Sequence, residues 1–205
     1  MVLYNVNKNS WLKGEISVRN RIIILDPGHG GRDPGAVSMG INEKDLNLKI
    51  AAKLHFLLQN RGIKVKMTRT DDRYLFLGDR VRMANNLKAD IFISIHCNAS
   101  NSPRTNGIET LYYPESFKGK VLAEEIQLKL VDKLKRKDLG IKTRDDLFVL
   151  KYTSMPAVLI ECGFLTNPEE KKLLTSDSYG NDIATAISSA ASEYFEKLNR
   201  KEVRR

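Results

Sequence analysis

The chain has 205 residues, of which 41% are hydrophobic and 29% are charged. This is an ordinary globular balance, and the length suits one domain with a sizeable core rather than two domains. No stretch approaches the roughly 18 apolar residues that cross a bilayer, and residues 1–20 contain no apolar run of signal-peptide type. The sequence therefore predicts no membrane span and no signal peptide within this chain.

The formal net charge at pH 7 is +9, which favours anionic partners without specifying a fold. The aromatic residues are not interleaved with the basic ones as a base-stacking surface requires, so a nucleic-acid partner is disfavoured. We expect an N-terminal extension over residues 1–20, a single folded domain over 21–198 and a basic tail over 199–205.

Short apolar runs alternate with amphipathic segments, which is typical of an α/β domain with a mostly parallel sheet flanked by helices. Strands are expected at residues 22–25, 63–67, 91–95, 108–112, 147–150 and 157–160. Helices are expected at residues 42–60, 77–87, 117–135 and 179–197, with a short one from residue 167. Asn42 is expected to cap the first helix, and Gly62 to close it.

Three residues with catalytic or metal-binding potential follow or end predicted strands. His29 follows the first strand, His96 ends the third, and Glu161 ends the strand at 157–160. In open α/β sheets the functional site lies outside the carboxyl ends of the strands. If these strands run parallel, two imidazoles and a carboxylate meet at one edge of the sheet.

The loop DPGHGGRDPGA carries His29 and is rich in glycine and proline. Such a loop can hold a histidine on a tight turn beside a ligand, although a phosphate-binding loop or a plain turn would look similar. Glu43 opens the helix that follows, where a glutamate either complements the helix dipole or serves as a third metal ligand. Two histidines and one carboxylate leave a coordination position open for water, as catalytic zinc sites require.

The remaining histidine and the two cysteines are not expected to act. His55 lies on the far side of its helix from the apolar stripe and should be exposed to solvent. Cys97 and Cys162 each follow a proposed site residue on a strand, so their side chains should point away from it. We expect both to be buried free thiols.

Several separate motifs occur in one order along the chain: DPGHGGRDPGA, NEKDLNL, TRTDD, LGDRVRMAN, ADIFISIHCNAS, GIETLYY and PAVLIECGFLTN. In these motifs, over residues 21–195, the chain resembles the zinc-dependent type-3 class of N-acetylmuramoyl-L-alanine amidases. The resemblance implies a single α/β domain with a twisted sheet of about six strands. It also implies Zn²⁺ held by His29, Glu43 and His96, with Glu161 as the catalytic carboxylate.

The resemblance implies peptidoglycan as the partner and the bond between N-acetylmuramic acid and L-alanine as the one cleaved. From that substrate alone we expect the protein to act outside the cytoplasm, either in the cell wall or as a secreted protein. Arg80 and Asn98 match recurrent family positions that support the site or bind substrate. Some family members carry a plug helix after the second histidine; here the chain passes from GIETLYYPES into the next helix without room for one. The sequence shows no recognisable cell-wall-binding repeat, so we expect targeting to need a partner protein, the basic surface or a region outside this chain.

Other functions remain open. A zinc peptidase acting on stem peptides would use the same ligand set, and a non-haem iron oxygenase also uses two histidines and one carboxylate. A wall-binding module that has lost catalysis is a third possibility, although all four key residues are present. A serine hydrolase is disfavoured because the chain contains no GxSxG motif.

Overall fold

A single six-stranded sheet organises the chain, and the computed structural model describes residues 20–202. The strands follow the order β4-β1-β5-β8-β6-β7. Their bounds are β1 Ile22–Pro27, β4 Lys64–Met67, β5 Ile91–Asn98, β6 Ile108–Tyr112, β7 Asp138–Thr143 and β8 Ala157–Phe164. A two-stranded hairpin, β2 (Val37–Ser38) and β3 (Ile41–Asn42), stands apart from this sheet. The predicted α/β class with a mostly parallel sheet of six strands is confirmed.

The strands β4, β1, β5 and β8 run parallel, so their carboxyl ends meet at one edge of the sheet. Strand β6 runs antiparallel to β8, and β7 runs parallel to β6. The start of β6 therefore lies at the same edge as the end of β8. This edge carries the histidines and the carboxylates that the sequence singled out.

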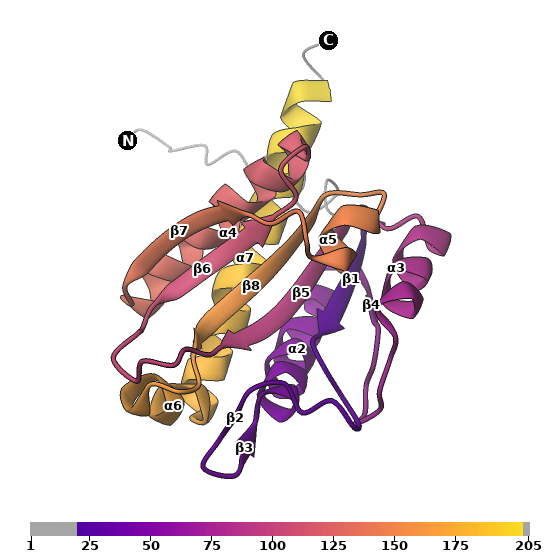
Figure 1. Ribbon diagram of the computed structural model, residues 1–205. Helices are drawn as coiled ribbons and strands as arrows, with labels where there is room; N and C mark the ends of the chain where they lie inside the picture. The colour runs from indigo at the N-terminus through magenta and orange to yellow at the C-terminus, as the bar shows by residue number, and fades with distance from the viewer. Residues whose placement is uncertain (1–19, 203–205) are drawn as a thin grey trace, which may run out of the picture.

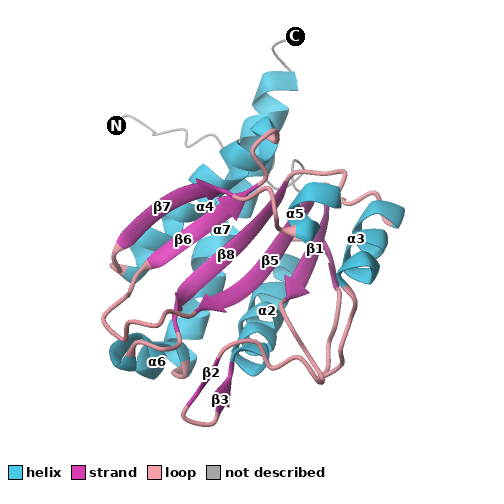
Figure 2. Cartoon of the chain, viewed as in Figure 1, coloured by secondary structure: helices cyan, strands magenta, loops and turns pink. Residues whose placement is uncertain are grey.

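Helices cover both faces of the sheet (Figures 1 and 2). Three long helices pack together against one face: α2 (Glu43–Asn60), α4 (Phe117–Leu134) and α7 (Asp177–Glu202). On the other face lie α3 (Leu77–Asn86) and the short α5 (Phe148–Tyr152), and α6 (Pro168–Leu174) follows β8 at the edge. None of the helices in the described part of the chain is long and apolar enough to cross a membrane.

The alternation of side chains along each strand produces two hydrophobic clusters. The larger cluster lies between the sheet and the three long helices and includes Ile23, Ile93 and Val158. The smaller one lies under α3 and α5 and includes Ile24, Phe92 and Leu159. Beyond this smaller cluster, towards the carboxyl ends of β5 and β8, the same face carries polar residues.

The expected elements differ from the observed ones in a few places. The strand expected at 147–150 is wrong, because this segment begins α5, whose Val149 and Leu150 pack into the smaller cluster. Strand β7 was not expected at all. Helix α7 runs past residue 197 to Glu202, so part of the expected basic tail is helical, while 203–205 and 1–19 lie outside the described residues.

Helix α2 begins and ends where expected, but the expected N-cap hydrogen bond is absent from the described structure. Asn42 is the N-cap residue, but its side chain accepts no capping hydrogen bond. At the other end the helix closes at Arg61, followed by Gly62 with φ of +78°, which is the left-handed geometry that glycine adopts without strain.

Candidate metal centre

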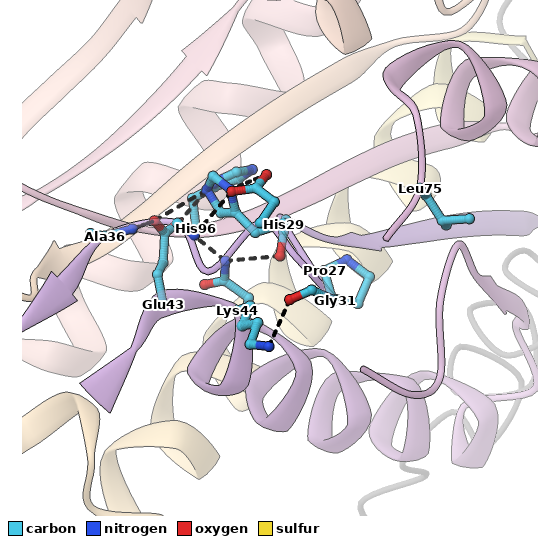
Figure 3. A network of polar contacts seen from close by, with 12 residues as sticks. Pro27, His29, Gly31, Ala36, Glu43, Lys44, Leu75 and His96 are labelled. Atoms are coloured by element: carbon cyan, nitrogen blue, oxygen red, sulfur yellow. Dashed lines mark hydrogen bonds and ion pairs between the residues drawn. The ribbon is translucent and has the colours of Figure 1, made fainter. Parts of the chain in front are cut away.

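His29, Glu43 and His96 converge at the carboxyl edge of the sheet (Figure 3). One nitrogen of each imidazole and one carboxylate oxygen of Glu43 all lie within 4.8 Å of one another. Glu43 Oε2 is 3.1 Å from His29 Nε2, and Glu43 Oε1 is 2.9 Å from His96 Nδ1. The two imidazole rings meet edge to face with centroids 4.9 Å apart. The structure thus brings together the three residues expected to bind a metal.

Two glycines provide the space for these side chains. A Cβ atom on Gly28 would lie 2.2 Å from Cε1 of the His96 ring. A Cβ atom on Gly35 would lie 2.5 Å from Glu43 Oε2 and 2.6 Å from His29 Cδ2, and Gly35 has φ of +66°. His29 itself has φ of +62°, an uncommon backbone conformation for a residue with a side chain. The glycine-rich loop is therefore shaped around the three candidate ligands.

The loop and the start of α2 hold Glu43 from several sides. The main-chain N–H groups of Ala36 and Cys97 donate to its two carboxylate oxygens, at 2.9 and 3.1 Å. Asn47, one helical turn later and fully buried, donates to Glu43 Oε1 at 3.1 Å. These donors fix the carboxylate in one orientation towards the imidazoles.

The carboxylate of Asp33 supports His29 from behind. Asp33 Oδ2 lies 2.8 Å from His29 Nδ1, which leaves Nε2 facing Glu43. A carboxylate bonded to the far nitrogen of an imidazole fixes the ring and strengthens it as a metal ligand. The sequence reasoning missed Asp33; its place four residues after His29 in the same loop was the one available signal.

Charges within the group are mutually stabilising. Burial disfavours the charged form of Glu43, but its hydrogen bonds to the two imidazoles outweigh burial and hold its pKa well below the usual range. Burial likewise opposes the protonated form of His29, yet Glu43 and Asp33 raise the pKa of this imidazole to about 9. Glu43 and His29 therefore stabilise each other's charged forms.

Glu161 lies in the adjacent strand beside His96. The two residues are register partners in the parallel pair β5 and β8, so their side chains emerge on the same face of the sheet. Glu161 Oε2 is covered from solvent and has no hydrogen-bond partner among the described residues. Burial, with the charges of Glu43 and Glu109, raises the pKa of Glu161 to about 7 although His96 opposes the rise. A carboxyl group with such a pKa can take up and return protons near neutral pH.

Asn98 lies at the end of β5, next to this row of residues. Its amide donates to Glu109 Oε1 at 3.0 Å, and Glu109 is also paired with Lys142. Glu109 is in turn the register partner of Glu161 on β6, so His96, Glu161 and Glu109 form a line across three strands. Glu109 was not singled out from the sequence.

Arg80 is buried beneath the loop of His29 rather than exposed in front of it. Its guanidinium pairs with Asp26 Oδ1 at 2.7 Å and donates to the carbonyl oxygens of Pro27 and His29 at 2.9 and 2.8 Å. Asp26 is held further by Thr68 and Ser94. This position ties α3 to the main chain on either side of Gly28.

The two cysteines and His55 lie apart from the three candidate ligands. Cys97 and Cys162 are buried free thiols, as expected, and belong to the larger hydrophobic cluster on the opposite face from the site. His55 is half-buried rather than exposed and is not part of the ligand group. Residues 99–116 contain no helix, in line with the expectation of no plug segment there.

The donor set suits a divalent metal ion such as zinc. Imidazole nitrogens and a carboxylate oxygen are ligands that zinc accepts, and three protein ligands leave a fourth position for water or substrate. The Asp33 support, the pre-oriented Glu43 and the unpartnered Glu161 oxygen are the features expected around a hydrolytic metal centre. The residues therefore fit a catalytic metal site.

Comparisons with known proteins agree with this geometry. Residues 23–193 match the family model described as N-acetylmuramoyl-L-alanine amidase. The chain is 39% identical over 176 residues to N-acetylmuramoyl-L-alanine amidase LytC of Bacillus subtilis, covering 84% of this chain and 35% of that protein. This chain thus spans about a third of the length of that relative.

Two further comparisons cover the relatives more completely. The germination-specific N-acetylmuramoyl-L-alanine amidase of Bacillus subtilis is 34% identical over 203 residues, covering 92% of this chain and 86% of that protein. The structure of the CwlD amidase from Clostridioides difficile, solved in complex with the GerS lipoprotein, superposes with a TM-score of 0.84 at 38% identity, covering 86% of this chain and 99% of that one. With the family model matching most of its length, this chain belongs to the N-acetylmuramoyl-L-alanine amidase family.

Proposed function

We propose that this chain is a zinc-dependent N-acetylmuramoyl-L-alanine amidase, which hydrolyses the amide bond between N-acetylmuramic acid and the L-alanine of the stem peptide in bacterial peptidoglycan. The observation that carries the proposal is the pairing of His96 with Glu161 across β5 and β8. This pairing supports the proposal because the carboxylate of Glu161, lying beside a group that can hold a metal, would be able to transfer protons there. Family membership supplies the substrate, because neither the geometry nor the composition identifies a sugar or a peptide.

In this proposal His29, Glu43 and His96 hold Zn²⁺, which when bound polarises the amide carbonyl and lowers the pKa of water. Glu161 accepts the proton of the attacking water and passes it to the nitrogen of the leaving L-alanine. One C–N bond breaks, one C–O bond forms, and the products are the lactyl carboxylate and a free amino group. Asp33 keeps Nε2 of His29 directed at the centre throughout.

We propose different roles for Arg80 and Asn98. The buried position of Arg80, its ion pair with Asp26 and its hydrogen bonds to the carbonyl oxygens of Pro27 and His29 support a role in fixing the loop of His29 rather than in contacting substrate. Asn98 lies at the open end of β5 beside Glu109, a place from which it can contact the stem peptide. The domain over 21–198 is proposed as the catalytic unit.

Peptidoglycan as substrate implies that the enzyme acts outside the cytoplasm, in the cell wall or the surrounding medium. Among the described residues no helix is long and apolar enough to cross a membrane. A protein partner for targeting or activation is part of the proposal, because the related CwlD amidase was solved in complex with the GerS lipoprotein.

A digest of purified peptidoglycan by the zinc-loaded protein tests the proposal. Mass spectrometry should find stem peptides with a free L-alanine amino terminus and glycan strands without peptides. A chelator and the Glu161→Ala variant should each abolish these products. Release of fragments cut within the stem peptide would identify a zinc peptidase instead. Binding to the wall without any cleavage, by a zinc-loaded protein, would indicate a non-catalytic wall-binding module.

A further inference from the structure

Arg69, two residues after the end of β4, is fully buried beside the candidate metal centre, although the sequence offered no role for it. Its side chain has 0% exposure and is among the largest fully buried side chains in the described chain. All four hydrogen bonds that it makes to described residues end on main-chain carbonyl oxygens. A guanidinium normally found beside a carboxylate is used here to bind backbone.

The carbonyls that Arg69 binds belong to the two segments that carry metal ligands. Nε donates to Pro27 at 2.9 Å, and Nη2 donates to Gly28 at 2.8 Å, directly before His29. The same Nη2 donates at 2.8 Å to Lys44, directly after Glu43. One planar group therefore joins the loop of the first ligand to the first helical turn of the second.

The loop that carries His29 packs closely against Arg69. A Cβ atom on Gly30 would lie 3.0 Å from both Cδ and Nε of Arg69, so the loop passes directly over the guanidinium. Lys44 makes a related link from its own side chain, donating to the Gly31 carbonyl at 2.9 Å (Figure 3). The carbonyls of Gly28 and Gly31, before and after His29, are thus held by cationic side chains from the segment that follows β4 and from α2.

Burying a guanidinium is unfavourable unless its donors are satisfied, so a neutral residue would be less costly if only packing mattered. The second buried guanidinium nearby, Arg80, already has the carboxylate of Asp26. Arg69 has no such partner within ion-pair distance among the described residues, and its cost is offset by carbonyl bonds instead. A buried guanidinium at this position is explained if the site depends on holding these carbonyls in place.

We propose that Arg69 is a positioning residue that sets the distance between the segments of His29 and Glu43 before metal binds, and so determines metal affinity. The inference rests on the metal-binding part of the proposed function. It does not depend on the substrate. Loss of the planar fork should allow the two segments to move apart, so that part of the binding energy of the ion is used to bring them back together.

The test measures zinc affinity of the full chain for the wild type, Arg69→Lys and Arg69→Gln, by competition with a chromogenic chelator. Both variants should bind Zn²⁺ about 10- to 100-fold more weakly, the range typical for residues that orient metal ligands. The increase in melting temperature on adding zinc should shrink in the same variants. A folded variant with wild-type zinc affinity would overturn the proposal.

Gln127→Met is the matched control. Gln127 is also buried and also donates to a main-chain carbonyl, that of Ile108, but it joins α4 to β6 away from both ligand segments. The Gln127→Met variant should lower the melting temperatures of metal-free and zinc-loaded protein equally and leave zinc affinity unchanged. A purely structural Arg69 would behave in the same way as this control.

Hydrogen–deuterium exchange on the wild type tests the same idea without a variant. In the metal-free protein, amides of the loop over residues 28–36 and the first turn of α2 should already be protected, with little further protection on adding zinc. Free exchange of the loop until zinc is added would overturn the proposal. Since no peptidoglycan is involved, a protein that binds zinc as expected but cleaves nothing would contradict only the proposed amidase activity.

Discussion

His96 and Glu161 are paired in register on neighbouring parallel strands, so two side chains emerge next to each other from one face: an imidazole that can bind metal, and a carboxylate whose Oε2 has no hydrogen-bond partner within residues 20–202. Glu43 approaches the same imidazole from the start of α2. The arrangement separates two carboxylates by environment. Glu43 is surrounded by donors that keep it ionised, whereas Glu161 is half-buried and its covered Oε2 has no donor among the described residues, and this contrast suits one to hold a cation and the other to move a proton.

Replacement of Glu161 by glutamine should remove catalysis and spare metal binding. The amide keeps the shape of the carboxyl group but cannot accept the proton, so kcat should fall by about 10²- to 10⁴-fold. The zinc content of the purified variant, measured by mass spectrometry of the metal, should equal that of the wild type. Loss of zinc together with activity would instead make Glu161 a ligand.

The same variant should reveal the cost of burying Glu161 through the pH dependence of stability. Burial raises the pKa of Glu161 from 4.5 to about 7 in the metal-free protein, so folding favours its protonated form. The contribution is favourable below pH 4.5 and is lost as the pH rises towards 7, because the folded state then carries a buried charge. At pH 8, metal-free Glu161→Gln should be more stable than wild type by about 2–3 kcal/mol.

At pH 4 the difference between the metal-free proteins should vanish, and bound zinc should reduce it at pH 8 because a nearby cation stabilises the ionised carboxylate. Chemical denaturation of both proteins at the two pH values provides the measurement. Equal stability at pH 8 without metal would mean that Glu161 is better solvated than its position indicates.

Gly28→Ala should disrupt the metal centre through a direct clash. The added Cβ atom would lie 2.2 to 2.7 Å from three atoms of the His96 ring, so the ring or the loop must shift. Overpacking of this kind costs about 1–3 kcal/mol, and zinc affinity should fall with it. Gly78→Ala is the control, because nothing lies within 4 Å of a Cβ atom there. In helix α3 it should be neutral or stabilise by up to about 1 kcal/mol.

Asp33→Asn should weaken zinc binding without unfolding the protein. The neutral amide supports the His29 ring less strongly than a carboxylate, and such partners typically contribute about 10- to 100-fold in metal affinity. Calorimetric titration with zinc provides the measurement. Asp132→Asn, which alters an exposed pair with Lys135, should bind zinc as the wild type does. Unchanged affinity in Asp33→Asn would show that the ring is held adequately by the loop itself.

Arg80→Met separates the two roles considered for this residue. Removing the guanidinium leaves Asp26 buried and unpaired, which typically costs about 3–5 kcal/mol of unfolding free energy. Urea denaturation should detect this loss. A variant of normal stability with a raised KM would instead assign Arg80 to substrate binding.

The fold was largely predictable because most of its strands are short buried apolar runs, as in β1, β5 and β8. The strand predicted at residues 147–150 was wrong because the four apolar residues LFVL fit a strand and a helical turn equally well. Tertiary packing decided between the two. Strand β7, with the sequence DLGIKT, has too few apolar residues to be recognised, since it lies at the sheet's edge and is largely exposed.

The site residues that follow directly from the order of the parallel strands could be predicted from the sequence. His29, His96 and Glu161 follow from the rule that parallel strands end at one edge. Asp33, Glu109 and Arg69 could not be found in this way. Their positions depend on a loop that turns back on itself, on an antiparallel neighbour, and on a side chain that points inward from a strand end.

The reversal of direction at β6 determines which connections border the candidate metal centre. The connection over residues 99–107 arrives at the edge that holds Glu161, whereas the connection over 113–116 lies at the opposite end of the sheet. Residues inserted in the first connection would lie at the edge of the sheet that carries the centre. The same residues inserted in the second would lie at the far end of the sheet, so an insertion could alter access to the centre from one connection and not from the other.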